Sequence, residues 1–172
     1  LMENNSAIID YSTNGKRSDF LDVYLGAKCD FMICSETGLS HIPIVFRRPL
    51  VLVNYVLLWG LIRCPSGIVI SKKYYSSNDK RYLSFKEIIK IGAFSTGNDL
   101  IQKGIRLIEN TAEEIHDAAI EMDERLKGNW NTTKEDEDLQ QSLWEILGPS
   151  KLKNPDLRFG SKFLQQNQEL LQ

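Results

Sequence analysis

Residues 29–54 read CDFMICSETGLSHIPIVFRRPLVLVN, and this stretch decides the fold class. The apolar run CDFMIC ends in the polar turn SETG, and apolar residues at helical spacing follow over 39–46. A second apolar run, led by Pro49, closes the stretch. The order strand, tight turn, helix and strand is typical of the βαβ unit of a parallel sheet. The sequence therefore predicts an α/β fold, in which this helix is short or kinked because Pro43 lies inside it.

Apolar runs and capping residues elsewhere in the chain predict further strands and helices. Short strands are expected at residues 7–10, 68–70 and 105–108, the last of these as the final strand of the fold. Helices are expected to begin after the N-cap residues Ser18, Ser84, Thr111, Thr133 and Ser161 and to end near residues 27, 91, 127, 147 and 171. The first of these helices carries an apolar face of Phe20, Leu21, Tyr24 and Leu25.

Three stretches show no clear period. Residues 72–82 (KKYYSSNDKRY) are expected to form a basic, aromatic loop. That loop is either a solvated connection or a lid or docking surface for an anionic ligand. Residues 55–63 are apolar and are expected to form a buried loop or a short helix, whereas residues 151–160 are expected to be irregular.

Composition narrows the class of protein. The chain has 172 residues, 42% of them hydrophobic and 26% charged, as in an ordinary globular protein. A net charge of −2 argues against a general nucleic-acid binder. Three cysteines without a C-x-x-C pair suggest a reducing compartment, and two histidines exclude a multi-histidine metal site. No signal peptide or bilayer-length apolar run is recognised, so a cytoplasmic location is expected.

The polar turn after the first strand is the candidate binding site. In open parallel sheets, ligands bind beyond the carboxyl ends of the strands, where such turns lie. Backbone N–H groups at a helix start favour an anion, most simply a phosphate, and Gly38 lets the ligand approach the backbone closely. We expect the hydroxyl groups of Ser35, Thr37 and Ser40 to donate hydrogen bonds to the ligand. Glu36 would accept hydrogen bonds from sugar hydroxyls, and His41 would donate a hydrogen bond to a phosphate.

Two alternatives to a binding turn stay open. The segment can also be a plain βα turn capped by Thr37, and His41 can be a half-buried histidine with structural hydrogen bonds. Several familiar chemistries have no motif here: the sequence holds no P-loop, no G-x-G-x-x-G, no G-x-S-x-G, no histidine pair at i, i+4 and no calcium-loop spacing.

The run E-T-G-L-S-H, followed by an apolar helix and P-x-h-h-h-h (h, apolar), resembles the D-T-G-L-S-H turn of GT-B glycosyltransferases such as the bacterial heptosyltransferases. In those enzymes the turn holds the diphosphate of the nucleotide-sugar donor, in a C-terminal Rossmann-like domain. Over most of its length the chain resembles a family of bacterial GT-B glycosyltransferases associated with surface polysaccharide synthesis. The shared patterns are I-D-Y, R-S-D-F-L-D-V-Y-L-x-A-K-C, S-x-x-G-L-S, P-x-V-L-x-N, L-S-F-x-E-I, E-N-T-x-E-E-I, D-E-D-L-Q and R-x-G-x-x-F-L-x-x-N.

The resemblance implies roles for particular residues. The donor diphosphate would be lined by Ser35, Thr37, Gly38, Leu39 and Ser40, and Glu36 stands where the heptosyltransferases have Asp. Residues expected at a neighbouring strand end and the following helix start are Asp10, Tyr11, Arg17 and Asp19. The Arg17 guanidinium would neutralise phosphate charge, and its alternative is a surface ion pair with Asp19 or Asp22. Arg158 and Gly160 would pack the terminal helix onto the core.

The resemblance also implies how the chain is organised. Residues 1–128 would form a partial Rossmann-like nucleotide-sugar-binding domain, and residues 129–172 a C-terminal helical extension that packs on it. A GT-B enzyme needs a second such domain for the acceptor, and 172 residues leave no room for one. The chain is therefore expected to be a fragment or truncated product that binds donor but transfers no sugar alone.

The expected partners are a nucleotide-sugar donor and, through the missing domain, a glycan acceptor. No metal, other cofactor or nucleic acid is expected, whereas the full-length parent could contact a membrane peripherally and the chain could form a homo-oligomer. Two other classes stay open: a nucleotide-sugar epimerase-like domain, and a non-catalytic Rossmann-like assembly module. An epimerase would isomerise the sugar without an acceptor, and an assembly module would form oligomers through exposed apolar surfaces.

Overall fold

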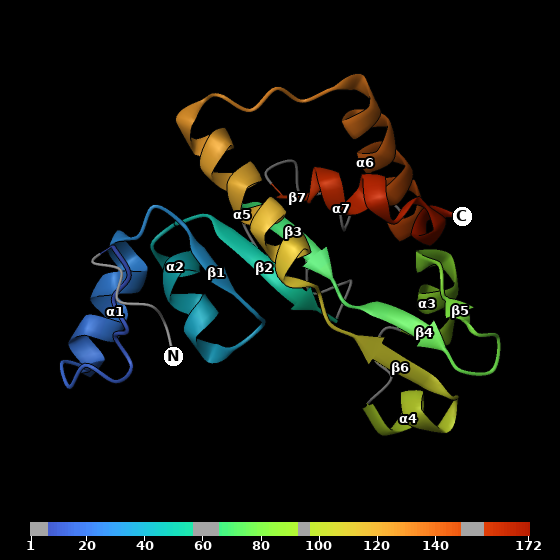
Figure 1. Ribbon diagram of the computed structural model, residues 1–172, viewed down its shortest axis with the longest axis horizontal. Helices are drawn as coiled ribbons and strands as arrows, with labels where there is room; N and C mark the ends of the chain where they lie inside the picture. Colours follow the sequence, from blue (N-terminus) through green and yellow to red (C-terminus); the bar gives the residue numbers. More distant parts are fainter. Residues whose placement is uncertain (1–6, 57–65, 93–96, 149–156) are drawn as a thin grey trace.

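A four-stranded parallel sheet, in the order β1-β2-β3-β7, forms the centre of the molecule (Figure 1). The computed structural model describes residues 7–56, 66–92, 97–148 and 157–172. The strands are β1 (Met32–Cys34), β2 (Leu50–Tyr55), β3 (Gly67–Ser71) and β7 (Leu157–Phe159). The predicted α/β fold with a parallel sheet is confirmed, and so are the strands expected after Pro49 and at residues 68–70.

The two middle strands are buried because helices flank the sheet. Leu50 and Val51 of β2, and Val69 and Ile70 of β3, have no exposed surface. Strands of a parallel sheet that are covered on both faces read as continuous apolar runs, as LVLV and GIVI do here. The expectation for residues 55–63 falls largely outside the described residues.

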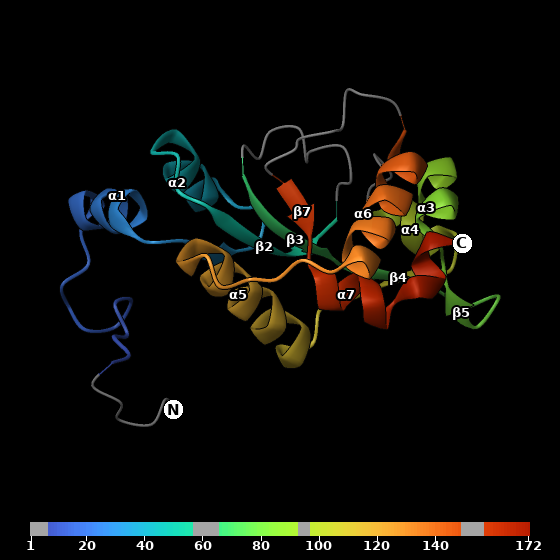
Figure 2. The same ribbon diagram turned by 90° about the horizontal axis from the view of Figure 1, so that it is seen from above.

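Seven α-helices lie in the described residues, and four of them begin after a capping residue expected from the sequence. They are α1 (Asp19–Lys28), α2 (His41–Val45), α3 (Phe85–Ile91), α4 (Gly97–Gln102), α5 (Ala112–Lys127), α6 (Lys134–Leu147) and α7 (Ser161–Gln166), with 3₁₀ turns η1 (Gly38–Ser40) and η3 (Gln168–Leu171). In Figure 2, α5 and α7 lie on one side of the parallel sheet and α2 lies on the other. Capping boxes at Ser84, Thr111 and Thr133 confirm three of the predicted helix starts.

A second, antiparallel sheet extends from the end of β3. Its order is β5-β4-β6, with β4 at Lys73–Ser76, β5 at Arg81–Tyr82 and β6 at Ile105–Ile108. The prediction of a loop at residues 72–82 is therefore wrong, because this stretch folds into a β-hairpin. Burial along β4 alternates with the period of two that a strand requires, but only two of its four side chains are buried.

Two strand expectations need correction. Residues 7–10 do not form a strand: Ile8 and Ile9 are 53% and 76% exposed, so this apolar run finds no neighbouring strand to pair with. The strand expected at 105–108 is confirmed as β6, but it is antiparallel and is not the last. The last is β7, in the stretch expected to be irregular, and it was missed because it has three residues with Arg158 in the middle.

The C-terminal segment differs from the expected single helix capped by Ser161. Gly160 occupies the N-cap position of α7, and this helix ends at its C-cap residue Asn167, before the 3₁₀ turn η3. The buried Glu121 carboxylate accepts hydrogen bonds from the Ser161 backbone N–H at 2.7 Å and its hydroxyl at 3.0 Å. Ser161 therefore fastens α7 to α5 instead of capping its own helix. Residues 129–172, expected to be a helical extension, also supply strand β7 to the sheet.

The capping box of α3 makes stability depend on pH. Hydrogen bonds from Arg81, and then from the Ser84 backbone N–H, lower the pKa of Glu87 from 4.5 to about 2. The charged carboxylate therefore stabilises the fold above pH 4.5, and this contribution disappears as the pH falls toward 2. We expect Glu87→Gln to lower the free energy of unfolding at pH 7 by about 1 kcal/mol, a modest loss because water screens the pair.

Urea denaturation of both proteins between pH 7 and pH 2.5 measures this effect. The difference between them should shrink steadily below pH 4.5. A difference that stays constant over this range would contradict the role given to the Glu87 charge.

Candidate functional site

The turn between β1 and α2 lies at the carboxyl edge of the parallel sheet. Thr37 is extended (φ −138°, ψ 167°), and the chain then enters the 3₁₀ turn η1. The Ser40 backbone N–H donates to the Thr37 carbonyl at 3.1 Å. Because this is the first hydrogen bond of the turn, the N–H groups of Gly38 and Leu39 have no acceptor inside it. The structure thus presents two adjacent backbone donors where the sequence predicted an anion site.

The surroundings of these donors are open. A Cβ added to Gly38 would have no neighbouring atom within 4 Å, so the backbone is accessible from that side. The side chains of Ser35, Glu36 and Thr37 are exposed, and Thr37 makes no capping hydrogen bond. An incoming ligand can therefore reach both the backbone donors and the polar side chains before them.

The second half of the predicted site is arranged differently. The Ser40 hydroxyl is buried and donates to the Thr37 carbonyl at 2.6 Å, so it holds the turn together. His41 is exposed and is the first residue of α2. The predicted helix 39–46 is reduced to the five residues of α2 after η1, so its dipole adds little to anion binding. The backbone donors of the turn itself remain as the candidate anion-binding feature.

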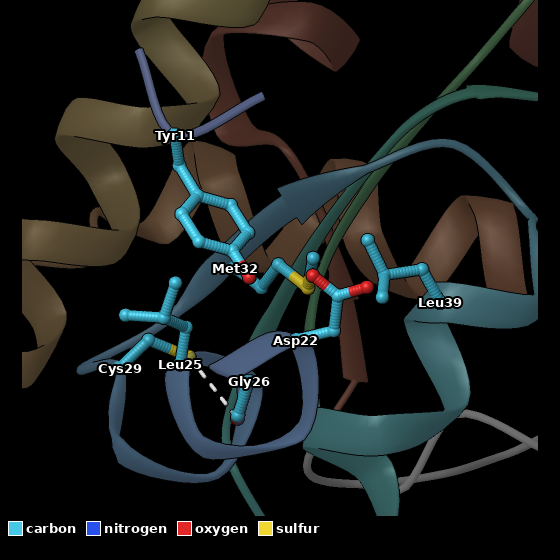
Figure 3. A pocket seen from close by; sticks show the side chains of 7 residues that line it. All are labelled: Tyr11, Asp22, Leu25, Gly26, Cys29, Met32 and Leu39. Atoms are coloured by element: carbon cyan, nitrogen blue, oxygen red, sulfur yellow. Dashed lines mark hydrogen bonds between the residues drawn. The ribbon is translucent and has the colours of Figure 1, made fainter. Parts of the chain in front are cut away.

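Helix α1 packs closely against α2, the helix that follows the turn. A Cβ at Gly26 would lie 2.8 Å from Ile42 Cγ2, so only glycine lets α1 approach α2 this closely. A cavity of about 220 Å³ lies between α1, β1 and the turn (Figure 3). Its lining is mainly apolar and consists of Tyr11, Asp22, Leu25, Gly26, Cys29, Met32 and Leu39. Of the predicted site residues, Tyr11 and Leu39 are brought together here.

The other residues expected beside the turn, Asp10, Tyr11 and Arg17, interact with residues close to them in the sequence. Arg17 forms an ion pair with Asp22 at 3.3 Å, which is one of the two alternatives that the sequence left open. The Tyr11 hydroxyl donates to the Ser18 carbonyl at 3.2 Å and accepts from the Ser18 backbone N–H at 3.1 Å. Hydrogen bonds from Thr13 and Ser12 lower the pKa of Asp10. Because residues 7–10 form no strand, Asp10 and Tyr11 do not lie at a strand end.

The two described cysteines are poor nucleophiles. Burial raises the pKa of the Cys34 thiol to about 11, and it also raises the pKa of Cys29. Both side chains are therefore neutral thiols at physiological pH, whereas nucleophilic attack requires the thiolate. In the described part of the chain, no three His, Cys, Asp or Glu side chains are grouped to hold a metal ion.

A buried polar network at the carboxyl ends of β2 and β3 was not anticipated from the sequence. Asn54 and Asn110 bond reciprocally, each backbone N–H donating to the other side chain's Oδ1, at 2.6 and 2.7 Å. Asn110 Nδ2 also donates to the Ser71 carbonyl at 2.9 Å. Asn54 has φ of 55°, a conformation that asparagine tolerates better than most residues.

The same network includes an ion pair. Lys73 Nζ lies 2.7 Å from Glu114 Oε1, and both side chains are nearly buried. Burial raises the pKa of Glu114, but hydrogen bonds from Lys73 and the Thr111 backbone N–H outweigh it and lower the pKa overall. The run E-N-T before the α5 capping box was the available signal, although its residues indicated only a helix start. The network fixes the N-terminus of α5 to the edge of the sheet on which the candidate site lies.

Comparison of the chain with protein-family models, with curated proteins and with solved structures finds no match. Among the described helices, none has the length and apolar character needed to cross a lipid bilayer.

Proposed function

We propose that this chain is the donor-binding part of a glycosyltransferase, and that the turn after β1 binds the diphosphate of a nucleotide sugar. The observation that carries the proposal is the open pair of N–H donors at Gly38 and Leu39, at the carboxyl edge of a parallel sheet. Ligands of such sheets bind at this edge. The resemblance of E-T-G-L-S-H to a diphosphate-binding turn supports the same reading.

Each group at the turn has a role in this function. The backbone donors would bind the diphosphate oxygens, whose negative charge increases as the bond to the sugar breaks. The Ser35 and Thr37 hydroxyls would add donors, and Glu36 would accept hydrogen bonds from the sugar. The Ser40 hydroxyl would act indirectly, by holding the Thr37 carbonyl and hence the shape of the turn. The acceptor hydroxyl also needs a general base, a role that we assign to none of the described residues.

The variant Gly38→Val tests the proposal. An added Cβ meets no atom within 4 Å, so we expect the fold to be retained while the approach to the backbone donors is blocked. We expect nucleotide-sugar affinity to fall by about tenfold or more, the equivalent of roughly one charge-assisted hydrogen bond. Isothermal titration calorimetry against nucleoside diphosphates and nucleotide sugars measures the loss.

Gln141→Val is a matched control, because it places the same side chain at an exposed position on α6. It should bind these ligands as the wild type does. Wild-type affinity in Gly38→Val, with the fold intact by circular dichroism, would show that the turn is not the donor site.

A second candidate, the non-catalytic assembly module, is favoured by a different observation. The apolar face predicted for α1 is not covered in the described structure: Phe20, Tyr24 and Leu25 are 72%, 46% and 45% exposed. Apolar surface of this kind marks contacts with other proteins. Light scattering after size exclusion separates the candidates, because assembly predicts an oligomer whose formation does not depend on nucleotide.

A further inference from the structure

One face of the antiparallel sheet carries a cluster of aromatic and cationic side chains. Tyr75 of β4 lies directly opposite Tyr82 of β5 and Arg106 of β6. Directly opposed residues of an antiparallel sheet project from the same face, and Lys73 shares it because it lies two residues from Tyr75. We call Lys73, Tyr75, Tyr82 and Arg106 the tyrosine face. The alternate residues of β4, Tyr74 and Ser76, are buried on the opposite face.

The side chains of the tyrosine face hold one another in place. The rings of Tyr75 and Tyr82 meet edge to face, with centroids 5.6 Å apart and planes at 76°. Arg106 Cζ lies 5.2 Å from the centre of the Tyr75 ring, and Lys73 Nζ lies 5.7 Å from that of Tyr82. These cation–π contacts fix the positive groups without neutralising them.

Two residues of the tyrosine face, Tyr82 and Arg106, are open to solvent. Figure 2 shows α3 and α4 together on one side of the antiparallel sheet. The burial of Tyr74 and Ser76 indicates that these helices cover the face opposite the tyrosine face. Tyr82 is 36% exposed and Arg106 is exposed. Arg81 and Lys73 have carboxylate partners, Glu87 and Glu114, whereas Arg106 has no ion pair within the described residues. Arg106 is therefore available to bind an external anion.

Charge around the tyrosine face contrasts with the rest of the chain. Residues 72–106, which include the antiparallel sheet and the helices beside it, contain eight Lys or Arg and three Asp or Glu, a net charge of +5. The ion pairs of Lys72 with Glu109 and of Lys73 with Glu114 offset two of these positive charges. Since the whole chain carries −2, the remainder carries −7. Such a local excess of positive charge attracts polyanions even when the protein as a whole is acidic.

The position of the tyrosine face relates it to the candidate site. Ser71 ends β3, and β4 begins only two residues later at Lys73. Because β1 and β3 belong to the same parallel sheet, the carboxyl end of β3 and the turn after β1 lie at the same edge. The antiparallel sheet therefore starts from the edge that carries the turn after β1, the proposed binding site of the nucleotide sugar.

We propose that the tyrosine face binds an acidic oligosaccharide, and that this is the acceptor class for the sugar transfer, an inference that rests on the function proposed above. Carboxylates of the glycan pair with Arg106. Its sugar rings pack on the exposed part of Tyr82, and its hydroxyls hydrogen-bond with the phenol groups. A single-stranded nucleic acid fits less well, because its successive bases would stack on open ring faces, whereas Arg106 covers one face of Tyr75 and Lys73 covers one face of Tyr82.

Binding of hexagalacturonate, measured by calorimetry in low salt, tests this proposal. We expect the variants Tyr82→Ala and Arg106→Gln each to weaken binding by about fivefold, as the loss of one stacking or charged contact does. Lys134→Gln, which removes one positive charge from the exposed start of α6, should leave binding nearly unchanged. Neutral maltohexaose should bind far more weakly than hexagalacturonate.

Other ligands decide between this proposal and its alternatives. If hexaglutamate bound as tightly as hexagalacturonate, and Tyr82→Ala had no effect, the surface would bind anions through charge alone, and the proposal would be overturned. Tighter binding of hexauridylate would overturn it in favour of nucleic acid, and no binding of hexagalacturonate would overturn it outright. Gly38→Val should not change hexagalacturonate binding, so failure here is distinguishable from failure of the donor site.

Discussion

Replacing Gly67 with alanine is expected to lower the free energy of unfolding by about 4 kcal/mol or more, enough to unfold a marginally stable domain. Gly67 begins β3 with φ of +144°, a conformation that side chains rarely adopt. A Cβ at this position would lie 2.1 Å from the Leu50 carbonyl oxygen. Because that atom belongs to the backbone of β2, relief of the clash would separate two strands at the centre of the sheet.

Gly128→Ala is the matched control for this substitution. Gly128 also has positive φ, at 74°, but an added Cβ there meets no atom within 4 Å. Its cost should be about 1 kcal/mol, from the left-handed backbone alone. Urea denaturation measures both variants. Equal stability of Gly67→Ala and Gly128→Ala would contradict the close approach of β2 to β3 at Gly67.

The variant Glu114→Ala is expected to cost about 3–5 kcal/mol, because it leaves the nearly buried ammonium group of Lys73 without a partner. It also removes the acceptor for the Thr111 backbone N–H at 2.9 Å, and so half of the α5 capping box. Part of the loss therefore reflects the helix start and part the ion pair. The double variant Lys73→Met with Glu114→Ala should recover some stability, since no charge is then left unpaired.

Glu109→Ala provides the comparison for an exposed pair. Glu109 bonds Lys72 at 3.1 Å, but its side chain is 72% exposed. Solvent screening limits the value of such a pair to about 0–1 kcal/mol. Chemical denaturation of both variants at pH 7 measures the difference. Equal losses for Glu109→Ala and Glu114→Ala would contradict the buried network described at this edge of the sheet.

Much of the fold follows from local sequence signals. The run CDFMICSETG and the Pro-led run after it predicted β1, the turn and β2, because a polar turn between apolar runs is a local feature. The caps Ser84, Thr111 and Thr133 predicted three helix starts, since a capping residue bonds the backbone only three positions away. These interactions are confined to a few neighbouring residues, so one sequence suffices to recognise them.

The remaining features depend on contacts between distant segments. β7 is three residues long, and its place beside β3 comes from tertiary packing of Leu157 and Phe159. The β4–β5 hairpin was mistaken for a loop because its basic, half-exposed residues conceal the alternation of a strand. Serine is a residue type favoured at helix N-caps, but Ser161 donates its hydrogen bonds to the carboxylate of Glu121, forty residues earlier. Long-range partners of this kind leave no local signature in the sequence.

The candidate site divides in the same way. The open backbone at Gly38 could be predicted, because it depends on the residue type and on a local turn. The engagement of Arg17 with Asp22 was one of two stated alternatives, and side-chain type alone could not decide between them. The cavity beside Leu39 and the Asn54–Asn110 pair needed the three-dimensional structure, since each joins segments that are far apart in the chain.

Titration of the isotope-labelled protein with nucleoside diphosphates and nucleotide sugars, followed residue by residue through its amide NMR signals, tests the central proposal most directly. The two open donors of the turn predict that the largest changes occur at the amides of Gly38 and Leu39, and that the nucleoside without its diphosphate produces none there. Saturable changes confined to other parts of the chain, or no change with any of these ligands, would contradict a donor site at this turn.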